Sequence, residues 1–270
     1  MASEATINHI HSILLEQKAC HYYELVNRAY NTSRITEGVA QALAILQARD
    51  QADEIIVTSP SFKPKPIKFL YSTELPFKEV KSVITKKAEL LAKHYNLSDT
   101  IGKHAEQLVF EVCEYLGYTQ IEKRKEKHEG IGIGKRDIDI FARHPNNNYY
   151  QAIEVRNRHE AAKLAYLTSI LRTVSIASRK WNLPIQPALV TTFASSQILE
   201  LARAMDLAIA LSGIQIVPEE HRDLYEELRD VVALNVEITD TPTPYLRENI
   251  TRYILPHQYH EKKPTQTKQV

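Results

Sequence analysis

The spacing of apolar residues predicts three short helices at the start of the chain. Ile7, Ile10 and Ile13 recur at three-residue intervals within residues 5–17, as expected for one face of a helix. A second helix is expected around residues 22–26. Ser33 is a suitable N-cap for a third helix, whose apolar stripe consists of Ile35, Val39, Leu43 and Leu46.

The spacing then changes to that of strands. The runs EIIVTS (54–59) and PIKFLYST (66–73) are rich in β-branched and aromatic residues, and the prolines and lysines between them are typical of an exposed hairpin tip. Three helices followed by a hairpin are the element order of a winged helix-turn-helix, so we expect such a domain over residues 1–76. An amphipathic helix from Phe77 to His94 then predicts a helical linker over residues 77–98.

From residue 99 onward, strand-like runs alternate with helical ones. Helices are expected at 101–116, 160–180 and 195–205, and strands at 118–122, in KRDIDIFAR, in YYQAIEVRN, at 188–192 and at 207–211. This alternation predicts an α/β domain over residues 99–217, with a central sheet covered by helices on both faces. Residues 218–260 are expected to be a helical and extended addition, and the polar residues 261–270 a disordered tail.

Charge and cysteine content limit the kind of protein. The 34 basic and 33 acidic residues give a formal net charge of +1, which excludes a uniformly polybasic binder. Residues 60–95 nevertheless hold eight lysines and three acids, a local surplus of five positive charges. Cys20 and Cys113 are too far apart in sequence for a CxxC metal site, and no run is long enough to span a membrane. We therefore expect a cytoplasmic protein without membrane contact.

Carboxylates on neighbouring predicted strands are the strongest chemical signal. In RDIDIFA the strand period places Ile138, Ile140 and Ala142 on one face and Asp137, Asp139 and Phe141 on the other. In AIEVRNR, Glu154 and Arg156 alternate with aliphatic residues. Asp139 and Glu154 on adjacent strands would supply the oxygen ligands that Mg²⁺ prefers. Glu106, on the predicted helix before them, is a third carboxylate near the same sheet. Salt bridges to nearby arginines are the structural alternative for each acid.

The order of these features resembles the PD-(D/E)XK nuclease superfamily. The resemblance covers roughly residues 99–218 and is nearest to the Mrr-type and Holliday-junction-resolvase branches, because a helix glutamate precedes D-I-D-I and E-V-R-N-R. It implies a restriction-endonuclease-like fold with a mixed central sheet. It also implies that Asp139 and Glu154 bind Mg²⁺ or Mn²⁺, with Asp137 as the alternative to Asp139 and Glu106 as an accessory acid. The implied reaction is metal-assisted hydrolysis of a phosphodiester bond.

Arg156 is where the sequence departs from that family, because it occupies the place of the catalytic lysine. Arginine stays protonated and can hold phosphate, whereas a lysine can also contact the attacking water. Lys135 or Lys163 could have taken over the lysine's role, or the site could be inactive. The sequence therefore predicts Arg156 as a catalytic residue and leaves the level of activity open.

Two other motifs fail on spacing. The sequence before Lys135 lacks the first glycine of a phosphate-binding P-loop, and Arg136 stands where that loop needs Ser or Thr. The histidines lack the spacing of a zinc site.

Three functions follow from these patterns. The leading one is a Mg²⁺-dependent DNA endonuclease, whose winged helix positions DNA and which would act as a homodimer when it cuts both strands. Its alternatives are a catalytically inactive DNA-binding protein and an assembly subunit. The predicted DNA contacts are Arg34, Lys63, Lys65 and Arg158, and the sequence leaves RNA open as a substrate.

Overall fold

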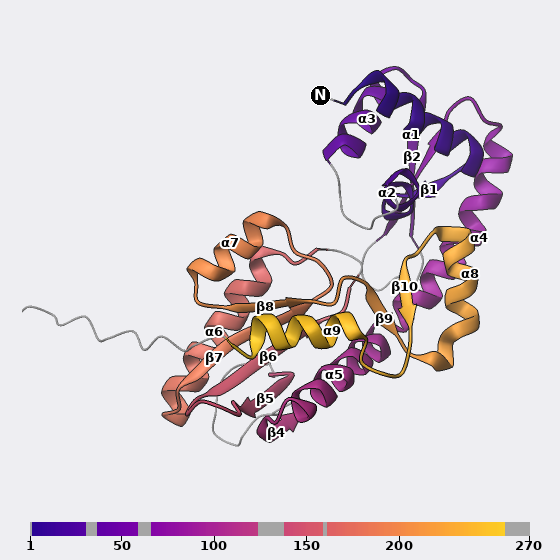
Figure 1. Ribbon diagram of the computed structural model, residues 1–270. Coiled ribbons are helices and arrows are strands. Elements are labelled where there is room, and N and C mark those ends of the chain that lie inside the picture. The colour runs from indigo at the N-terminus through magenta and orange to yellow at the C-terminus, as the bar shows by residue number, and fades with distance from the viewer. Residues whose placement is uncertain (1, 31–36, 59–65, 124–137, 159–160, 257–270) are drawn as a thin grey trace, which may run out of the picture. The chain divides into compact units, whose positions relative to one another are not determined.

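The computed structural model in Figure 1 describes residues 2–30, 37–58, 66–123, 138–158 and 161–256. The chain forms two compact units. The first comprises residues 1–104 and 214–240, and the second comprises residues 105–213 and 241–270. Each unit is therefore built from two separate stretches of sequence.

The first unit begins with the predicted order of three helices and a hairpin. A sheet with strand order β1-β3-β2 accompanies the helices, and its described pairs are antiparallel. Ser3 caps the first helix, because its side-chain oxygen accepts a hydrogen bond from the Thr6 N–H. The elements are α1 (Glu4–Gln17), β1 (Cys20–His21), α2 (Tyr22–Tyr30), α3 (Glu37–Ala48), β2 (Ala52–Val57) and β3 (Ile67–Ser72).

The apolar stripes predicted for these helices form a common core. Ile10 and Leu14 of α1 are fully buried and pack in one cluster with Val39 and Leu46 of α3. The predicted start of the third helix at Ser33 lies outside the described residues, and α3 is described from Glu37.

In a second part of the first unit, the long helix α4 (Phe77–Asn96) packs against residues 214–240. This stretch contains the parallel strands β9 (Gln215–Val217) and β10 (Val236–Ile238), the short helix η1 (Glu219–His221) and the helix α8 (Arg222–Val232). Tyr225 and Leu228 of α8 share a core cluster with Val80 and Leu91 of α4. Residues 214–240, which are distant in sequence, therefore supply part of the hydrophobic core of the N-terminal unit.

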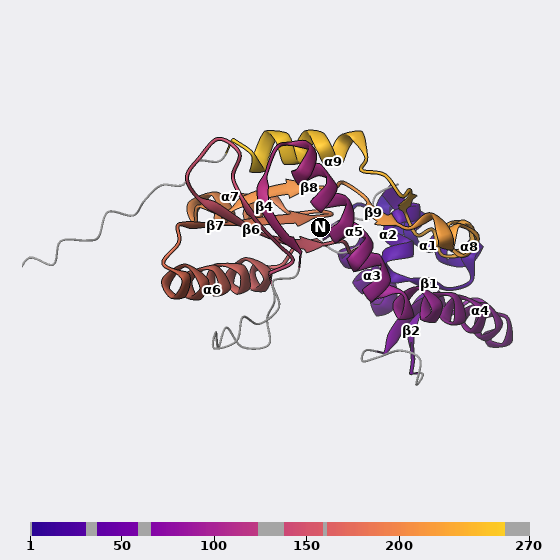
Figure 2. The ribbon, with the colours of Figure 1, turned by 90° about the horizontal axis from the view of Figure 1, so that it is seen from below.

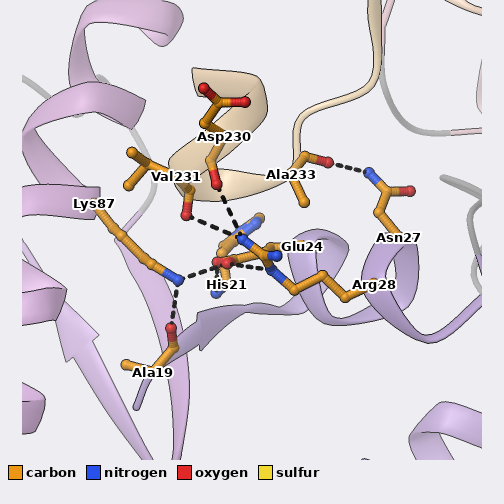
Figure 3. Close-up of polar contacts among 9 residues, drawn as sticks. All are labelled: Ala19, His21, Glu24, Asn27, Arg28, Lys87, Asp230, Val231 and Ala233. Carbon is orange, nitrogen blue, oxygen red and sulfur yellow. Dashed lines mark hydrogen bonds and ion pairs between the residues drawn. The ribbon is translucent and has the colours of Figure 1, made fainter. Parts of the chain in front are cut away.

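A buried group of charges lies where α2, α4 and α8 of the first unit meet (Figure 3). The Glu24 carboxylate accepts hydrogen bonds from Lys87 Nζ at 2.5 Å and from Arg28 Nε at 3.0 Å. Lys87 also donates to the Ala19 carbonyl at 2.7 Å, and Asn27 donates to the Ala233 carbonyl at 2.8 Å. Arg28 donates to carbonyls in the last turn of α8. These bonds compensate for much of the cost of burying Glu24 and Lys87 away from water.

The second unit contains a five-stranded mixed sheet with strand order β4-β5-β6-β7-β8. Strands β4 to β6 are antiparallel, and β6 to β8 are parallel. The strands are β4 (Thr119–Lys123), β5 (Ile140–Arg143), β6 (Tyr150–Arg156), β7 (Ile185–Thr191) and β8 (Ala208–Leu211). The helices are α5 (Ser98–Tyr115), which begins in the first unit, α6 (Leu164–Trp181), α7 (Ser196–Ala204) and α9 (Pro244–Asn249), continued by the π-helical turn η2 (Ile250–Ile254).

Helices cover both faces of this sheet. Figure 2 shows α6 on one side of the strands and α9 on the other, and Figure 1 shows α5 on the same side as α9. Leu167 and Ile170 of α6 pack with Phe141 and Leu189 of the sheet. The expectation of a mixed α/β fold, with a central mixed sheet flanked by helices, is therefore confirmed.

The predicted alternation in RDIDIFA is wrong in one respect. The strand begins at Ile140, so the period of two does not extend back to Ile138. Ile138 packs in the same core cluster as Phe141, and Ile140, Phe141 and Ala142 are all buried, because both faces of β5 are covered. Asp139 therefore lies just before the strand and not within it.

The helix formed by α9 and η2 was not predicted from the sequence. Leu246, Ile250 and Ile254 are buried at intervals of four residues. Residues spaced by four lie on one face of a helix, so this stripe is the side of α9 and η2 that is buried. In the part of the chain that the structure describes, no helix is both long and apolar enough to cross a membrane.

Candidate active site

Asp139 and Glu154 come together where β5 begins and β6 ends. Ile140 of β5 pairs with Ile153 of β6, so the register continued by one residue places Asp139 opposite Glu154. The Val155 N–H donates to Asp139 Oδ2 at 2.8 Å, so this carboxylate takes the place of a backbone acceptor beside the strand. The geometry therefore brings together the two acids that the sequence predicts as metal ligands.

The electrostatics of this pair are unfavourable without a counter-charge. Burial raises the pKa of Asp139 to about 7, and the neighbouring charges of Glu154 and Glu106 add to the rise. The hydrogen bond from Val155 and the positive charge of Arg156 lower the pKa in part. The location thus concentrates negative charge in a poorly solvated position, a pattern that occurs often at functional sites.

Glu106 lies on α5, where the sequence predicts an accessory acid. Its side chain is half-buried, and its charge acts on Asp139. No group of three or more His, Cys, Asp or Glu side chains that could hold a metal ion is found among the described residues. Glu106 thus influences Asp139 through its charge.

Arg156 makes two contacts that explain its orientation. It lies two residues after Glu154, on the same face of β6, and its guanidinium forms an ion pair with the Glu154 carboxylate. It also lies 5.8 Å from the centroid of the Tyr166 ring, near the start of α6. The salt bridge that was the structural alternative for Glu154 is therefore present.

The segment that follows β6 is held against the neighbouring strand. The Arg158 N–H donates to the Thr192 hydroxyl at 3.1 Å, directly after β7, while the Arg158 side chain is exposed. Glu154, Arg156 and Arg158 thus mark the carboxyl end of β6, and ligands of open sheets with parallel strands bind at such ends.

Several predicted residues lie outside the described part of the chain. These are Arg34 and the hairpin lysines Lys63 and Lys65, the alternative ligand Asp137, and the loop residues Lys135 and Arg136. Their predicted roles stay predictions.

The donor set fits a hard divalent cation. Asp139 and Glu154 offer carboxylate oxygens, and Mg²⁺ is commonly bound by one or two carboxylates together with water and substrate phosphate. A cation would also relieve the repulsion that raises the pKa of Asp139. Since Arg156 pairs with Glu154, this arginine and a cation would share the same carboxylate.

Two contributors to this site were not predicted from the sequence. The Val155 N–H orients Asp139, and the Tyr166 ring lies beside Arg156. The first is a backbone group, which leaves no signal in the residue type. The second depends on how α6 packs against the sheet, and the spacing of apolar residues does not report that packing.

Comparisons with known proteins give only distant similarity. No protein-family model matches the sequence, and no curated protein matches it. Among solved structures, a repair endonuclease from Pyrococcus abyssi is similar, with 11% identity and a TM-score of 0.29 over 59% of this chain and 61% of that one. An EndoMS–dsDNA2 complex is similar, with 12% identity and a TM-score of 0.30 over 58% of this chain and 63% of the other. At these values nothing about the activity of this chain follows from the two structures.

Proposed function

We propose that the protein is a metal-dependent DNA endonuclease of the PD-(D/E)XK type. The observation that carries the proposal is the position of Asp139 opposite Glu154 in the register of β5 and β6, where the charge of one carboxylate acts on the other at the carboxyl end of β6. Two neighbouring, partly buried carboxylates that raise the pKa of Asp139 are a pattern found at cation-binding sites, which favours such a role here.

The residues of the site have distinct roles in this proposal. Asp139, oriented by the Val155 N–H, and Glu154 would hold Mg²⁺ or Mn²⁺. When bound, such an ion supplies Lewis-acid activation of a phosphodiester and of the attacking water. Arg156 would hold the negative charge that grows on the phosphate, since a guanidinium stays protonated and cannot accept a proton. Glu106 strengthens the local negative field, and the exposed Arg158 would contact the DNA backbone.

The first unit would position the DNA as a winged helix. Its three helices and its sheet with order β1-β3-β2 support this proposal, together with the lysine-rich hairpin and α4. Lys63 and Lys65 at the hairpin tip are the proposed phosphate contacts.

The ion pair between Arg156 and Glu154 favours a second candidate. In a DNA-binding protein that has lost catalysis, this arginine would neutralise Glu154 permanently in place of a metal ion. The fold would then serve as a platform for DNA.

Substitution of Asp139 distinguishes the two functions. Asp139→Asn keeps an oxygen that accepts the Val155 hydrogen bond but removes the charge. For an endonuclease, we expect the variant to lose cleavage of duplex, branched and single-stranded DNA with Mg²⁺ or Mn²⁺, while DNA affinity stays within about threefold, because a metal ligand acts mainly on the transition state.

The control is Glu200→Gln, which removes an exposed carboxylate from α7. It should cleave like the wild type. The thermal unfolding temperature of Asp139→Asn at pH 8 should not be lower than that of the wild type, because the neutral amide relieves the repulsion from Glu154 and Glu106. Wild-type protein that binds DNA but cleaves none of these substrates would contradict the endonuclease and favour the binding-only function.

A further inference from the structure

The first unit carries an open groove along α4. It has a volume of about 700 Å³ and runs between one side of α4 and the strand β2. Its apolar lining includes Ile55 and Val57 of β2 and Ile84 and Ala88 of α4. Phe77, at the start of α4, remains 57% exposed beside it. The groove is thus an apolar surface that a partner could cover.

Side chains along the groove side of α4 are ordered by size and by charge. The bulky Phe77 lies at the amino end, whereas the small Ala88 and Ala92 lie toward the carboxyl end. Lys81 and Glu89 lie between these ends, with Thr85 midway between them. This order is complementary to itself when the helix direction is reversed.

Lys81 and Glu89 are too far apart along α4 to form an ion pair with each other. Eight residues separate them, which is about 12 Å along a helix. Both side chains are exposed, and within the described residues neither forms an ion pair. Among the described residues, each therefore keeps its charge available for an ion pair with a neighbouring molecule.

We propose that the groove is filled by a second copy of this chain, with α4 packed antiparallel against the partner's α4 around a two-fold axis at Thr85. In this register Lys81 faces the partner's Glu89, and Glu89 faces the partner's Lys81. Phe77 reaches the partner's Lys93, whose aliphatic stem and charge suit an aromatic ring. The two ion pairs form together because the axis repeats every contact.

Shape supports the same register. Ala88 and Ala92 leave room for the partner's larger side chains, and small residues let two helix axes approach to about 8 Å. Ile55 and Val57 of β2 would flank the partner's helix and lose their remaining contact with water. A homodimer through α4 requires no assumption about catalysis, so it stands or falls independently of the proposed endonuclease.

Charge reversal tests the pairing. Sedimentation equilibrium should show a reversible dimer for the full-length wild type. Lys81→Glu and Glu89→Lys should each weaken dimerisation about tenfold or more, because each places two like charges opposite each other.

An equal mixture of the two variants should recover association. In the mixed dimer, the glutamate introduced at position 81 of one chain faces the lysine introduced at position 89 of the other. At the second ion pair, the unchanged Glu89 of the first variant faces the unchanged Lys81 of the second, so both contacts again join opposite charges. Lys103→Glu, at an exposed lysine of α5 that does not line the groove, is the control and should dimerise like the wild type.

A cross-link tests the axis. With Thr85→Cys, mild oxidation should join two chains through a disulfide, because the two sulfurs meet at the two-fold axis. Lys78→Cys should not cross-link, since seven residues on each side of the axis place its sulfurs about 21 Å apart. The native Cys20 and Cys113 are buried and should not react in the folded protein.

Two results would overturn the proposal. One is a wild-type protein that stays monomeric at every concentration measured. The other is a dimer that neither single charge reversal weakens, provided that circular dichroism and thermal unfolding show both variants folded.

Discussion

Arg156 is able to fill either of two roles at the site, a structural ion pair with Glu154 or a contact with the phosphate of a substrate. Its guanidinium is shared between the Glu154 carboxylate and the Tyr166 ring, and neither contact uses all five of its N–H donors. An arginine in this position can stabilise a neighbouring carboxylate in the resting protein and still present N–H groups to a phosphate. The contacts of Arg156 are therefore compatible with both a structural and a catalytic role.

Substitution of Arg156 separates these roles. If the arginine holds phosphate charge, Arg156→Ala should lower the cleavage rate by about two to three orders of magnitude, as when one donor is removed from an oxyanion site. Arg156→Lys should retain or raise activity, because lysine keeps the charge and can contact the attacking water. Steady-state cleavage kinetics and thermal unfolding would be measured together. Full activity in a well-folded alanine variant would remove Arg156 from the catalytic residues.

The contacts of His144 determine which of its ring nitrogens carries the proton. Its Nδ1 accepts a hydrogen bond from the Asn146 N–H at 3.1 Å, so the proton is on Nε2, which donates to the Leu255 carbonyl at 2.6 Å. Burial lowers the pKa of His144, against the opposing effect of the bond to Leu255. The folded protein thus favours the neutral imidazole.

This preference predicts a dependence of stability on pH. Because the folded-state pKa is below the unfolded value of about 6.5, the contribution of His144 is fully present above that value and is lost as the pH falls through the folded-state pKa. When the pH is lowered from about 7.5 to about 5.5, the free energy of unfolding measured with urea should decrease less in His144→Gln than in the wild type. His9→Gln, at an exposed histidine, is the control. An equal loss in wild type and His144→Gln would refute the assignment.

At the scale of elements, the buried group around Glu24 ties α2 to α4. Removing one member of a buried ion pair leaves the other charge without compensation, which costs about 3–5 kcal/mol. We expect Glu24→Ala to lower the free energy of unfolding by about that amount. Lys87→Met should cost less, because Arg28 still pairs with Glu24. Chemical denaturation of both variants and of the Glu24→Ala, Lys87→Met double variant would be compared.

The double variant tests whether Glu24 and Lys87 stabilise the protein together. Coupling between the two positions should make its loss of stability smaller than the sum of the single losses. Strictly additive losses would mean that Glu24 and Lys87 act independently, contrary to the 2.5 Å contact between them.

The elements that could be predicted from the sequence are those with a continuous amphipathic or apolar pattern. The helices α1, α4 and α6 lie within a few residues of their expected ranges, because each buries an apolar stripe with the helical period. The strands β3 and β8 do so as well, because they are short, largely apolar runs. The two-residue strand β1 and the short parallel strands β9 and β10 contain too few residues to show a period. The π-helical turn of η2 is only five residues long, which is also too short to show a period.

For the candidate site, the two acids could be predicted from the sequence, but their side-chain partners could not. Asp139 and Glu154 were identified because acids interrupt apolar strand patterns, and the register of β5 and β6 then brings them together. The ion pair of Glu154 with Arg156 was only one of several alternatives, since side-chain partners are chosen by packing. The bond between His144 and Leu255 joins residues 111 positions apart, a distance over which residue spacing carries no information.

At the scale of the whole molecule, the first unit is assembled from two stretches of the chain. Tyr225 and Leu228 of α8 complete the core that α4 begins, and Asn27 depends on the Ala233 carbonyl. A fragment of residues 1–104 should therefore lack a cooperative unfolding transition, because its apolar face on α4 stays exposed. Joining residues 214–240 to that fragment through a short flexible linker should restore the transition, as measured by circular dichroism during heating.

The control is the same linked fragment with Leu228→Asp. It should behave like residues 1–104 alone, because a buried aspartate cannot occupy the core. A cooperative transition in the unlinked fragment would show that α8 is dispensable for folding.

The same arrangement sets an order of events during synthesis on the ribosome. Domains generally fold in the order in which they emerge, amino-terminal first, at about 5–20 residues per second. Here the amino-terminal unit waits for residues 214–240, whereas the strands β4 to β8 of the sheet emerge earlier. For roughly 7–27 s after residue 104 is made, at those rates, the apolar side of α4 is without α8. The nascent chain therefore presents this apolar helix face to chaperones while the sheet of the second unit is being synthesised.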